Sequence, residues 1–144
     1  MAEAPSFLAV LVDCSSTAWA HRPEALERLV EQLLFFVNAY NILAAGNQLL
    51  VIGFHPTEVC TVWPEPIYGA AEAAATPAEP PKLRASLLAT MQRLLSLPLT
   101  YVQPSGSRLS AALALSLCRM QRARRSDPKL QLRALVLQVL SPPR

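Results

Sequence analysis

An unbroken apolar run occupies residues 7–12 and stops at Asp13. Leucine, valine and phenylalanine make up most of it, and such side chains suit the pleated surface of a strand. Because no polar residue alternates with the apolar ones, we expect both faces of this strand to be covered, as in a central parallel strand between helices. Residues 48–54, 58–63 and 132–140 are the other predicted strands, and the first and last of these are also apolar on both faces.

Three further segments carry apolar residues at helical spacing. The first runs from Pro23 to about Leu43, with glutamates in its first turn and a glycine-type cap around Gly46. The second covers residues 82–97, and the third follows Ser107, which can cap it. The side chains predicted to point inward are Leu26, Leu29, Val30, Leu33, Val37 and Tyr40 in the first helix, Leu83, Leu87, Leu88, Met91, Leu94 and Leu95 in the second, and Leu109, Leu113, Leu117 and Met120 in the third.

The order strand, helix, strand, strand, helix, helix, strand predicts an α/β sandwich with right-handed crossovers and a central, mostly parallel sheet. A chain of 144 residues with 52% hydrophobic content has room for one domain and one core, so we expect a single domain over residues 1–144. Residues 69–81 are rich in alanine and proline and poor in bulky apolar side chains, which predicts a flexible surface loop.

Composition argues against several classes of protein. The net charge is only +3 and no basic-aromatic stripe is present, so direct nucleic-acid binding is not expected. Cys14, Cys60 and Cys118 are far apart and form no CxxC pair, which disfavours both a zinc site within this chain and a disulfide framework. No phosphate-binding glycine motif, signal peptide or membrane-length apolar run occurs, so we expect a soluble intracellular protein without nucleotide chemistry.

Candidate chemistry follows the first predicted strand. Asp13, Ser15 and Thr17 place three hard oxygen ligands on one short loop, at the end of a strand where ligands bind in parallel sheets. Mg²⁺ or Ca²⁺ would suit them; alternatively, Asp13 caps the loop by accepting backbone N–H bonds. His21 and His55 have no nucleophile and orienting group near them in the sequence, so catalysis is not expected.

Other residues allow two interpretations each. Trp19 and Trp63 could anchor a protein partner or pack the loops. Cys14 is better suited to a small buried position than to a reactive thiol, because the neighbouring carboxylate discourages thiolate formation. The arginines at positions 119–125 form a solvated helix end or, as the alternative, a site for phosphate or an acidic partner.

A strand ending in Asp13, Ser15 and Thr17, followed later by Gly106 and Ser107 at the start of a helix, resembles the von Willebrand factor A domain. The resemblance implies a Rossmann-like sandwich and a metal-ion-dependent adhesion site with Asp13, Ser15, Thr17 and Ser107 as ligands. The aspartate expected after the fourth strand is replaced by Ser141 and two prolines. With little negative charge left, and with Arg108 beside Ser107, we expect this degenerate site to be vacant.

One branch of that family is more similar. Asp13 with Trp19, then residues 47–55, 62–64 and 107–118, resemble the small A-type subunit of general transcription factor IIH (TFIIH). The resemblance implies a nuclear, non-enzymatic scaffold that acts in RNA polymerase II transcription initiation and nucleotide excision DNA repair. It implies binding to other TFIIH core subunits, chiefly the larger A-type subunit with its zinc-binding C-terminal domain.

Two departures from the family pattern accompany this resemblance. The C-terminal zinc module of the family is missing from this sequence, so no zinc is expected in this chain. The family sheet continues past the fourth strand, so we expect a partial domain, incomplete at its C-terminal edge, with that edge bare or covered by a partner. A metal-dependent ligand-binding A-domain that uses Mg²⁺ or Ca²⁺ is the alternative function.

Overall fold

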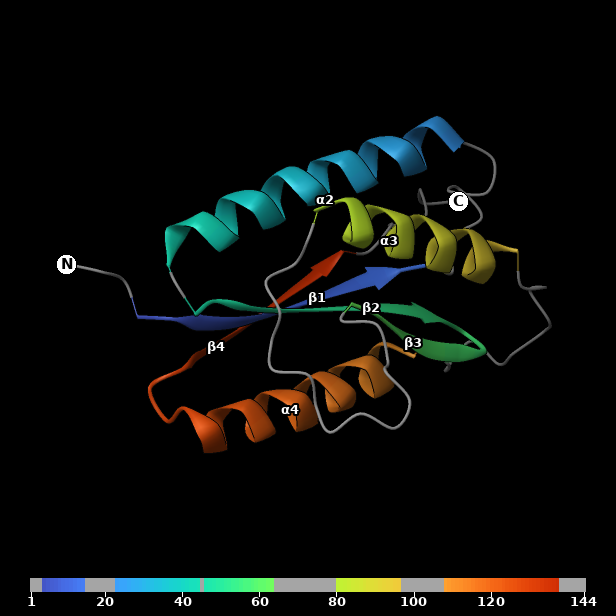
Figure 1. The fold of residues 1–144 in the computed structure, drawn as a ribbon. Coiled ribbons are helices and arrows are strands. Elements are labelled where there is room, and N and C mark those ends of the chain that lie inside the picture. Colours follow the sequence, from blue (N-terminus) through green and yellow to red (C-terminus); the bar gives the residue numbers. More distant parts are fainter. Residues whose placement is uncertain (1–3, 15–22, 45, 64–79, 97–107, 138–144) are drawn as a thin grey trace, which may run out of the picture.

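The computed structural model describes residues 4–14, 23–44, 46–63, 80–96 and 108–137 (Figure 1). Their helices and strands follow the predicted order. In chain order they are β1 (Ser6–Asp13), α2 (Pro23–Leu43), β2 (Gln48–His55), β3 (Glu58–Trp63), α3 (Pro80–Leu95), α4 (Leu109–Ser126) and β4 (Gln131–Leu137). No helix in the described ranges is long and apolar enough to cross a membrane.

The predicted boundaries differ from the observed ones mainly at α3 and β4. Helix α3 begins at Pro80, so the last two residues of the predicted loop 69–81 are helical, while residues 69–79 lie outside the described residues. Proline suits the first turn of a helix because its missing N–H has no partner there in any case. Strand β4 begins at Gln131, one residue before the predicted start, and residues 138–140 are again outside the described residues.

The four strands form one mixed, mostly parallel sheet, in the order β3-β2-β1-β4. Strand β1 pairs in parallel with β2 on one side and with β4 on the other, so that Val10 lies opposite both Val51 and Leu135. Strand β3 is antiparallel to β2. The prediction of an α/β sandwich around a mostly parallel sheet is therefore confirmed, with β1 in the interior as its apolar run indicated.

Helices cover both faces of the sheet, with α2 and α3 on one side and α4 on the other (Figure 1). Alternate side chains of β1 point to opposite layers, as the pleat requires. Leu8, Val10 and Val12 pack with the apolar faces of α2 and α3. Phe7, Ala9 and Leu11 pack in a second cluster with Ala112 and Met120 of α4. Helix α2 buries Leu26, Val30, Leu33, Val37 and Tyr40 as predicted, with Leu29 half-buried.

The apolar run in β4 is only partly covered, as expected for the last strand of an incomplete sheet. Every residue of β4 is either exposed or half-buried, and Val136 keeps 37% of its surface in contact with solvent. The reason is the strand's position: β4 is an edge strand of the four-stranded sheet, whereas β1 has a neighbour on each side. Within the described residues, the outer edge of β4 has no strand partner, which agrees with a sheet incomplete at its C-terminal edge.

The inward face of α4 also differs from the prediction. Leu117 was expected to point inward but is 56% exposed, while Ala112, Ser116 and Met120 are buried. These three residues recur every four positions, and Leu117 lies next to that stripe on its solvent side. Arg108 is the N-cap residue and makes no side-chain cap hydrogen bond. Ser107, which was predicted to cap this helix, lies outside the described residues.

A buried polar network joins the end of α2 to the start of β1. The Tyr40 hydroxyl donates to the Ser6 carbonyl oxygen at 2.7 Å and lies within hydrogen-bond distance of Ser6 Oγ, at 2.7 Å. Asn47 accepts from the Ser6 N–H through Oδ1 at 2.9 Å and donates to the Tyr40 carbonyl through Nδ2 at 2.8 Å. Gly46, at φ 89°, supplies the left-handed turn that brings Asn47 into place, as the predicted glycine cap requires.

Gly53 allows α3 to approach the sheet closely. A Cβ at this position would lie 2.9 Å from Leu94 Cδ1 and 3.4 Å from Cys14 Sγ. Leu94 and Cys14 are both buried in the core cluster, so neither side chain has free space into which to withdraw. The absence of a side chain at residue 53 therefore sets the distance between α3 and β2.

Replacing Asn47 by alanine should destabilise the fold by about 1–3 kcal/mol, because it removes two hydrogen bonds and leaves the part-buried Ser6 N–H without its acceptor. Urea unfolding followed by circular dichroism measures this change. Asn38→Ala is the matched control, since Asn38 is exposed on α2 and its loss should change the free energy of unfolding by less than about 0.5 kcal/mol. Equal effects of the two substitutions would contradict the role assigned to Asn47.

Gly53→Ala should destabilise the protein by about 1–3 kcal/mol through overpacking against Leu94. Leu94→Ala alone should cost about 2–5 kcal/mol, because it opens a cavity in the core. The double variant should be more stable than the sum of the two single effects predicts, since the cavity receives the added methyl group. Strictly additive free energies of unfolding would show that the two residues do not compete for the same space.

Candidate functional site

Asp13 lies where the sequence placed it, at the carboxyl end of β1. It pairs with Phe54 of β2, and only 8% of its surface is exposed. The Cys14 N–H donates to the Phe54 carbonyl at 2.8 Å, so the two strands stay paired beyond Asp13. The other three predicted ligands, Ser15, Thr17 and Ser107, lie outside the described residues, and so does Trp19. The structure thus places one member of the predicted metal site.

The Cys14 side chain turns into the core. Its thiol donates to the Val12 carbonyl at 3.6 Å. Burial, reinforced by the negative charge of Asp13, raises the pKa of Cys14 to about 12. A thiol with this pKa remains protonated at neutral pH and is a poor nucleophile. The predicted small buried role of Cys14 is therefore confirmed.

His55 ends β2 beside this carboxyl edge and is almost fully buried. Its Nδ1 accepts from the Thr57 N–H at 3.2 Å and lies 2.8 Å from Thr57 Oγ1. Burial lowers the pKa of His55, with Glu58 and Asp13 opposing that effect. A neutral ring that accepts through Nδ1 carries its proton on Nε2, and it holds the tight turn between β2 and β3.

Arg108 connects α4 to the same turn. Its Nε donates to the Pro56 carbonyl at 3.1 Å. This contact keeps a guanidinium group at the carboxyl edge of the sheet, where a dication would experience its charge as repulsion. In the described part of the chain, no three His, Cys, Asp or Glu side chains lie close enough together to hold a metal ion. Asp13 is therefore the only described residue of the predicted ligand set.

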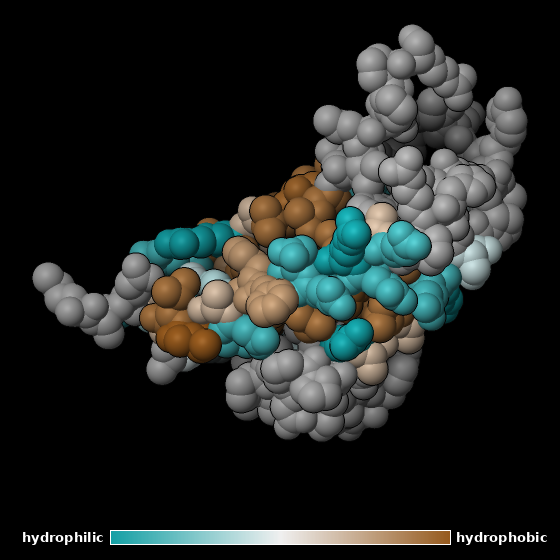
Figure 2. Space-filling view, turned by 90° about the horizontal axis from the view of Figure 1, so that it is seen from above, coloured by the Kyte–Doolittle hydropathy of each residue, from teal (hydrophilic) through white to brown (hydrophobic). Residues whose placement is uncertain are grey.

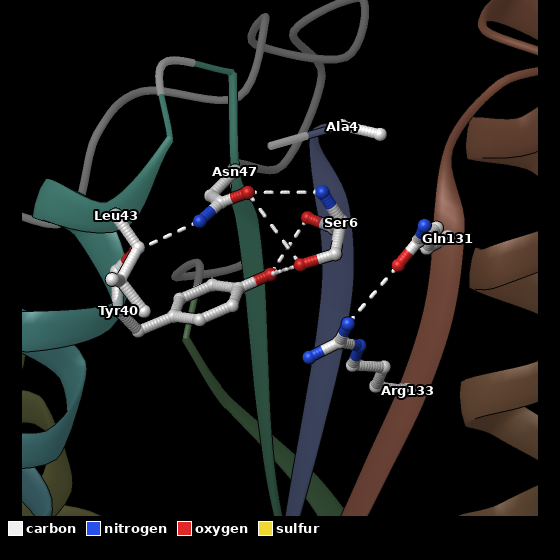
Figure 3. Close-up of a pocket in the computed structure, with 7 residues that line it drawn as sticks. All are labelled: Ala4, Ser6, Tyr40, Leu43, Asn47, Gln131 and Arg133. Atoms are coloured by element: carbon white, nitrogen blue, oxygen red, sulfur yellow. Dashed lines mark hydrogen bonds between the residues drawn. The ribbon is translucent and has the colours of Figure 1, made fainter. Parts of the chain in front are cut away.

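A second polar site lies at the opposite, amino end of the sheet (Figure 3). It is a pocket of about 200 Å³, lined by Ala4, Ser6, Tyr40, Leu43, Asn47, Gln131 and Arg133. The Tyr40–Ser6–Asn47 network forms its wall on the α2 side. On the β4 side, Arg133 Nη2 donates to Gln131 Oε1 at 3.0 Å. The sequence does not predict this pocket, because its lining comes from three elements separated by more than thirty residues each.

Charge in the amino-end pocket comes from Arg133. Burial raises the pKa of Tyr40, while the hydrogen bond with Ser6 and the nearby Arg133 act in the opposite direction. Arg133 is exposed, and among the described residues no carboxylate lies within ion-pair distance of it. The pocket therefore presents a positive charge to solvent beside the apolar Leu43. One sequence signal could have indicated this pocket: Tyr40, among the inward-facing residues of α2, carries a hydroxyl that needs a hydrogen-bond partner.

Trp63, one of two predicted partner anchors, is buried in the core cluster with Leu87, Met91 and Leu94. Its surface is therefore used within the fold. The arginines at the end of α4 are mostly in contact with solvent: Arg122, Arg124 and Arg125 are exposed, and Arg119 is half-buried. That arrangement agrees with a solvated helix end.

Comparison with known proteins gives a consistent result. No curated protein sequence matches this chain. Among solved structures, the crystal structure of the TFIIH p34 N-terminal domain is similar, with a TM-score of 0.73 and 22% sequence identity over 97% of this chain and 69% of that one. At this identity the likeness shows the fold, an α/β sandwich around a mostly parallel sheet. The family model described as transcription factor Tfb4 matches residues 5–142, nearly the whole sequence. The chain therefore belongs to the transcription factor Tfb4 family.

Proposed function

We propose that this protein is a non-enzymatic scaffold subunit of the TFIIH core complex, acting in RNA polymerase II transcription initiation and nucleotide excision repair. The observation that carries the proposal is the match of the Tfb4 family model over residues 5–142. The structural similarity to the TFIIH p34 N-terminal domain supports it. A nuclear location follows from the same proposal.

The described chemistry supports a binding role. The Cys14 thiol is held protonated in the core, and the buried His55 ring uses Nδ1 to hold Thr57 in the tight turn between β2 and β3, which is a structural role. The described sheet and helices instead present the edge of β4, which has no strand partner among the described residues, and the outer faces of α2 and α4. Covering such surfaces in a complex stabilises the folded chain by mass action.

The proposed partner is the larger A-type subunit of the TFIIH core, bound through its zinc-binding C-terminal domain. Zinc in this interaction belongs to the partner. Binding would occur through protein contacts, without sequence-specific recognition of nucleic acid by this chain. The modest net charge of +3 supports that division of roles.

A metal-dependent ligand-binding A-domain is the second candidate. The position of Asp13 favours it, because a nearly buried carboxylate at the carboxyl end of a central parallel strand lies where such sheets bind ligands. In that case Ser15, Thr17 and Ser107 would complete an oxygen site for Mg²⁺ or Ca²⁺ with Asp13. Arg108, held at the same edge by Pro56, opposes it.

A pull-down with the separately purified, zinc-bearing C-terminal domain of the larger A-type subunit tests the scaffold role. The chain is pretreated with EDTA, which is removed before mixing so that the partner keeps its zinc. We expect binding to be unchanged by the treatment, because protein contacts alone hold the complex. Absence of binding by soluble, folded chain under either condition would overturn the proposed function.

Substitution of Asp13 separates the two candidates further. If the scaffold role holds, Asp13→Asn should leave partner binding within about twofold of wild type, because Asp13 is 8% exposed and offers little contact surface. Titration with Mg²⁺, followed by isothermal calorimetry, should show no saturable heat for either protein. A saturable signal that disappears in Asp13→Asn, together with EDTA-sensitive binding restored by Mg²⁺, would establish the metal-dependent alternative.

A further inference from the structure

Helix α2 has an outward face that changes character halfway along its length. Phe35 and Ile42, two turns apart, are 71% and 84% exposed. In Figure 2, which views the molecule from the α2 side, brown and tan side chains gather at the left, over the C-terminal half of α2, and teal ones predominate over its N-terminal half. Large apolar side chains left in solvent on one helix face are typical of a protein-binding surface.

The apolar half of α2 extends toward β4. Phe36 and Leu43, also two turns apart, occupy one flank of the helix and are exposed, Leu43 by 65%. Leu43 lines the amino-end pocket together with Arg133, so this flank faces the open edge of the sheet. We call Phe35, Phe36, Ile42 and Leu43 the apolar patch. One end of the apolar patch therefore adjoins a guanidinium group with no carboxylate near it among the described residues.

The other end of the helix carries the opposite charge. Glu24, Glu27 and Glu31 are exposed in the N-terminal half of α2, together with a single cation, Arg28. The surface thus reads acidic, apolar and basic along its length, from Glu24 to Arg133. Complementarity to this pattern requires a partner that is basic, apolar and acidic in the same direction.

We propose that α2 and the adjoining pocket bind an amphipathic helix of another protein, antiparallel to α2. The apolar stripe of the bound helix would cover the apolar patch, its acidic N-terminal turn would reach Arg133, and its basic C-terminal turns would face Glu27 and Glu31. Acidic residues at the N-terminus and basic residues at the C-terminus also suit the dipole of that helix. Antiparallel packing sets the two helix dipoles in their favourable relative direction.

A second copy of this chain does not fit the same surface. In an antiparallel pair of α2 helices, Phe35 and Ile42 of one copy would face the glutamates of the other, which would desolvate carboxylates against apolar rings. Helix α4, with its basic C-terminal end, lies on the other side of the sheet. Among the described residues of α4, Leu117 is the only large apolar residue that is exposed. The chemistry therefore favours a different protein over a homodimer.

The proposed α2 site adds a specific surface to the scaffold role proposed above. It rests on that role in one respect, which is that the partner is a protein. The probe is a synthetic, fluorescein-labelled helical peptide of about 18 residues, which matches the distance from Glu24 to Ile42 at about 1.5 Å per residue. It carries glutamates in its first turn, leucines at helical spacing in its middle and lysines in its last turns. A control peptide has the same composition with the glutamates and lysines exchanged.

Fluorescence anisotropy with the full chain measures binding of each peptide. We expect the first peptide to bind saturably and the control peptide to bind at least about tenfold more weakly, because its charges repel both ends of the surface. Phe35→Ser/Ile42→Ser should weaken binding of the first peptide by about tenfold or more through loss of the apolar anchors. Glu27→Gln/Glu31→Gln should weaken it severalfold and reduce its dependence on salt.

Leu117→Ser is the matched control variant, since it removes an exposed leucine from α4 on the opposite side of the sheet. It should leave peptide affinity within about twofold of wild type. All substituted residues are exposed, so thermal unfolding by circular dichroism should match wild type, and the glutamate variant tests the surface without touching any apolar contact.

Three results would overturn the proposal: no saturable binding of the first peptide, equal binding of both peptides, or equal loss of binding in Leu117→Ser and Phe35→Ser/Ile42→Ser. Sedimentation of the wild-type chain as a dimer that Phe35→Ser/Ile42→Ser converts to a monomer would assign the surface to a second copy instead. Failed peptide binding with a positive pull-down would remove the α2 site and leave the scaffold role. Peptide binding with a failed pull-down would support the α2 site and overturn the proposed scaffold role.

Discussion

The fold depends on the complete burial of β1. All eight residues from Ser6 to Asp13 are buried, and the strand has a parallel neighbour on each side. A strand in that position cannot leave either face to water, so helices must cover both faces of the sheet. Leu8, Val10 and Val12 require α2 and α3 above them, while Phe7, Ala9 and Leu11 require α4 below. The three-layer arrangement follows from one apolar strand.

The polar groups at the two ends of the buried strand β1 find their hydrogen-bond partners in different ways. At the amino end, Ser6 is bound by Tyr40 and Asn47, which belong to α2 and the turn after it. At the carboxyl end, Cys14 continues the pairing with Phe54 and buries a thiol that stays protonated. The first end lines a pocket with an exposed cation, and at the second end the side chains of Asp13 and His55 are buried. Binding chemistry in the described residues therefore concentrates on the amino end and on α2.

A scaffold role in TFIIH and the α2 surface are compatible with each other for a physical reason. Within a small domain, apolar residues that are not needed by the core remain exposed only at a cost in solubility. Phe35 and Ile42 lie on the face of α2 opposite to Val30, Leu33 and Val37, so the core does not use them. In the proposed complex, a helix of another protein covers them. The charges at both ends of the apolar patch then select among proteins that could supply it.

The sequence by itself determined the order of the elements, the mostly parallel α/β fold and the inward face of α2. These depend on local periodicity, which one segment of chain expresses alone. The ordered similarity of residues 47–55 and 107–118 also indicated the family. The tertiary structure decided the rest: that Leu117 faces solvent, and that Arg133 meets Leu43 and Tyr40 in one pocket. Each of these depends on which distant segments become neighbours, and an apolar run or a single arginine reads the same in sequence whether its neighbour is a strand, a helix or water.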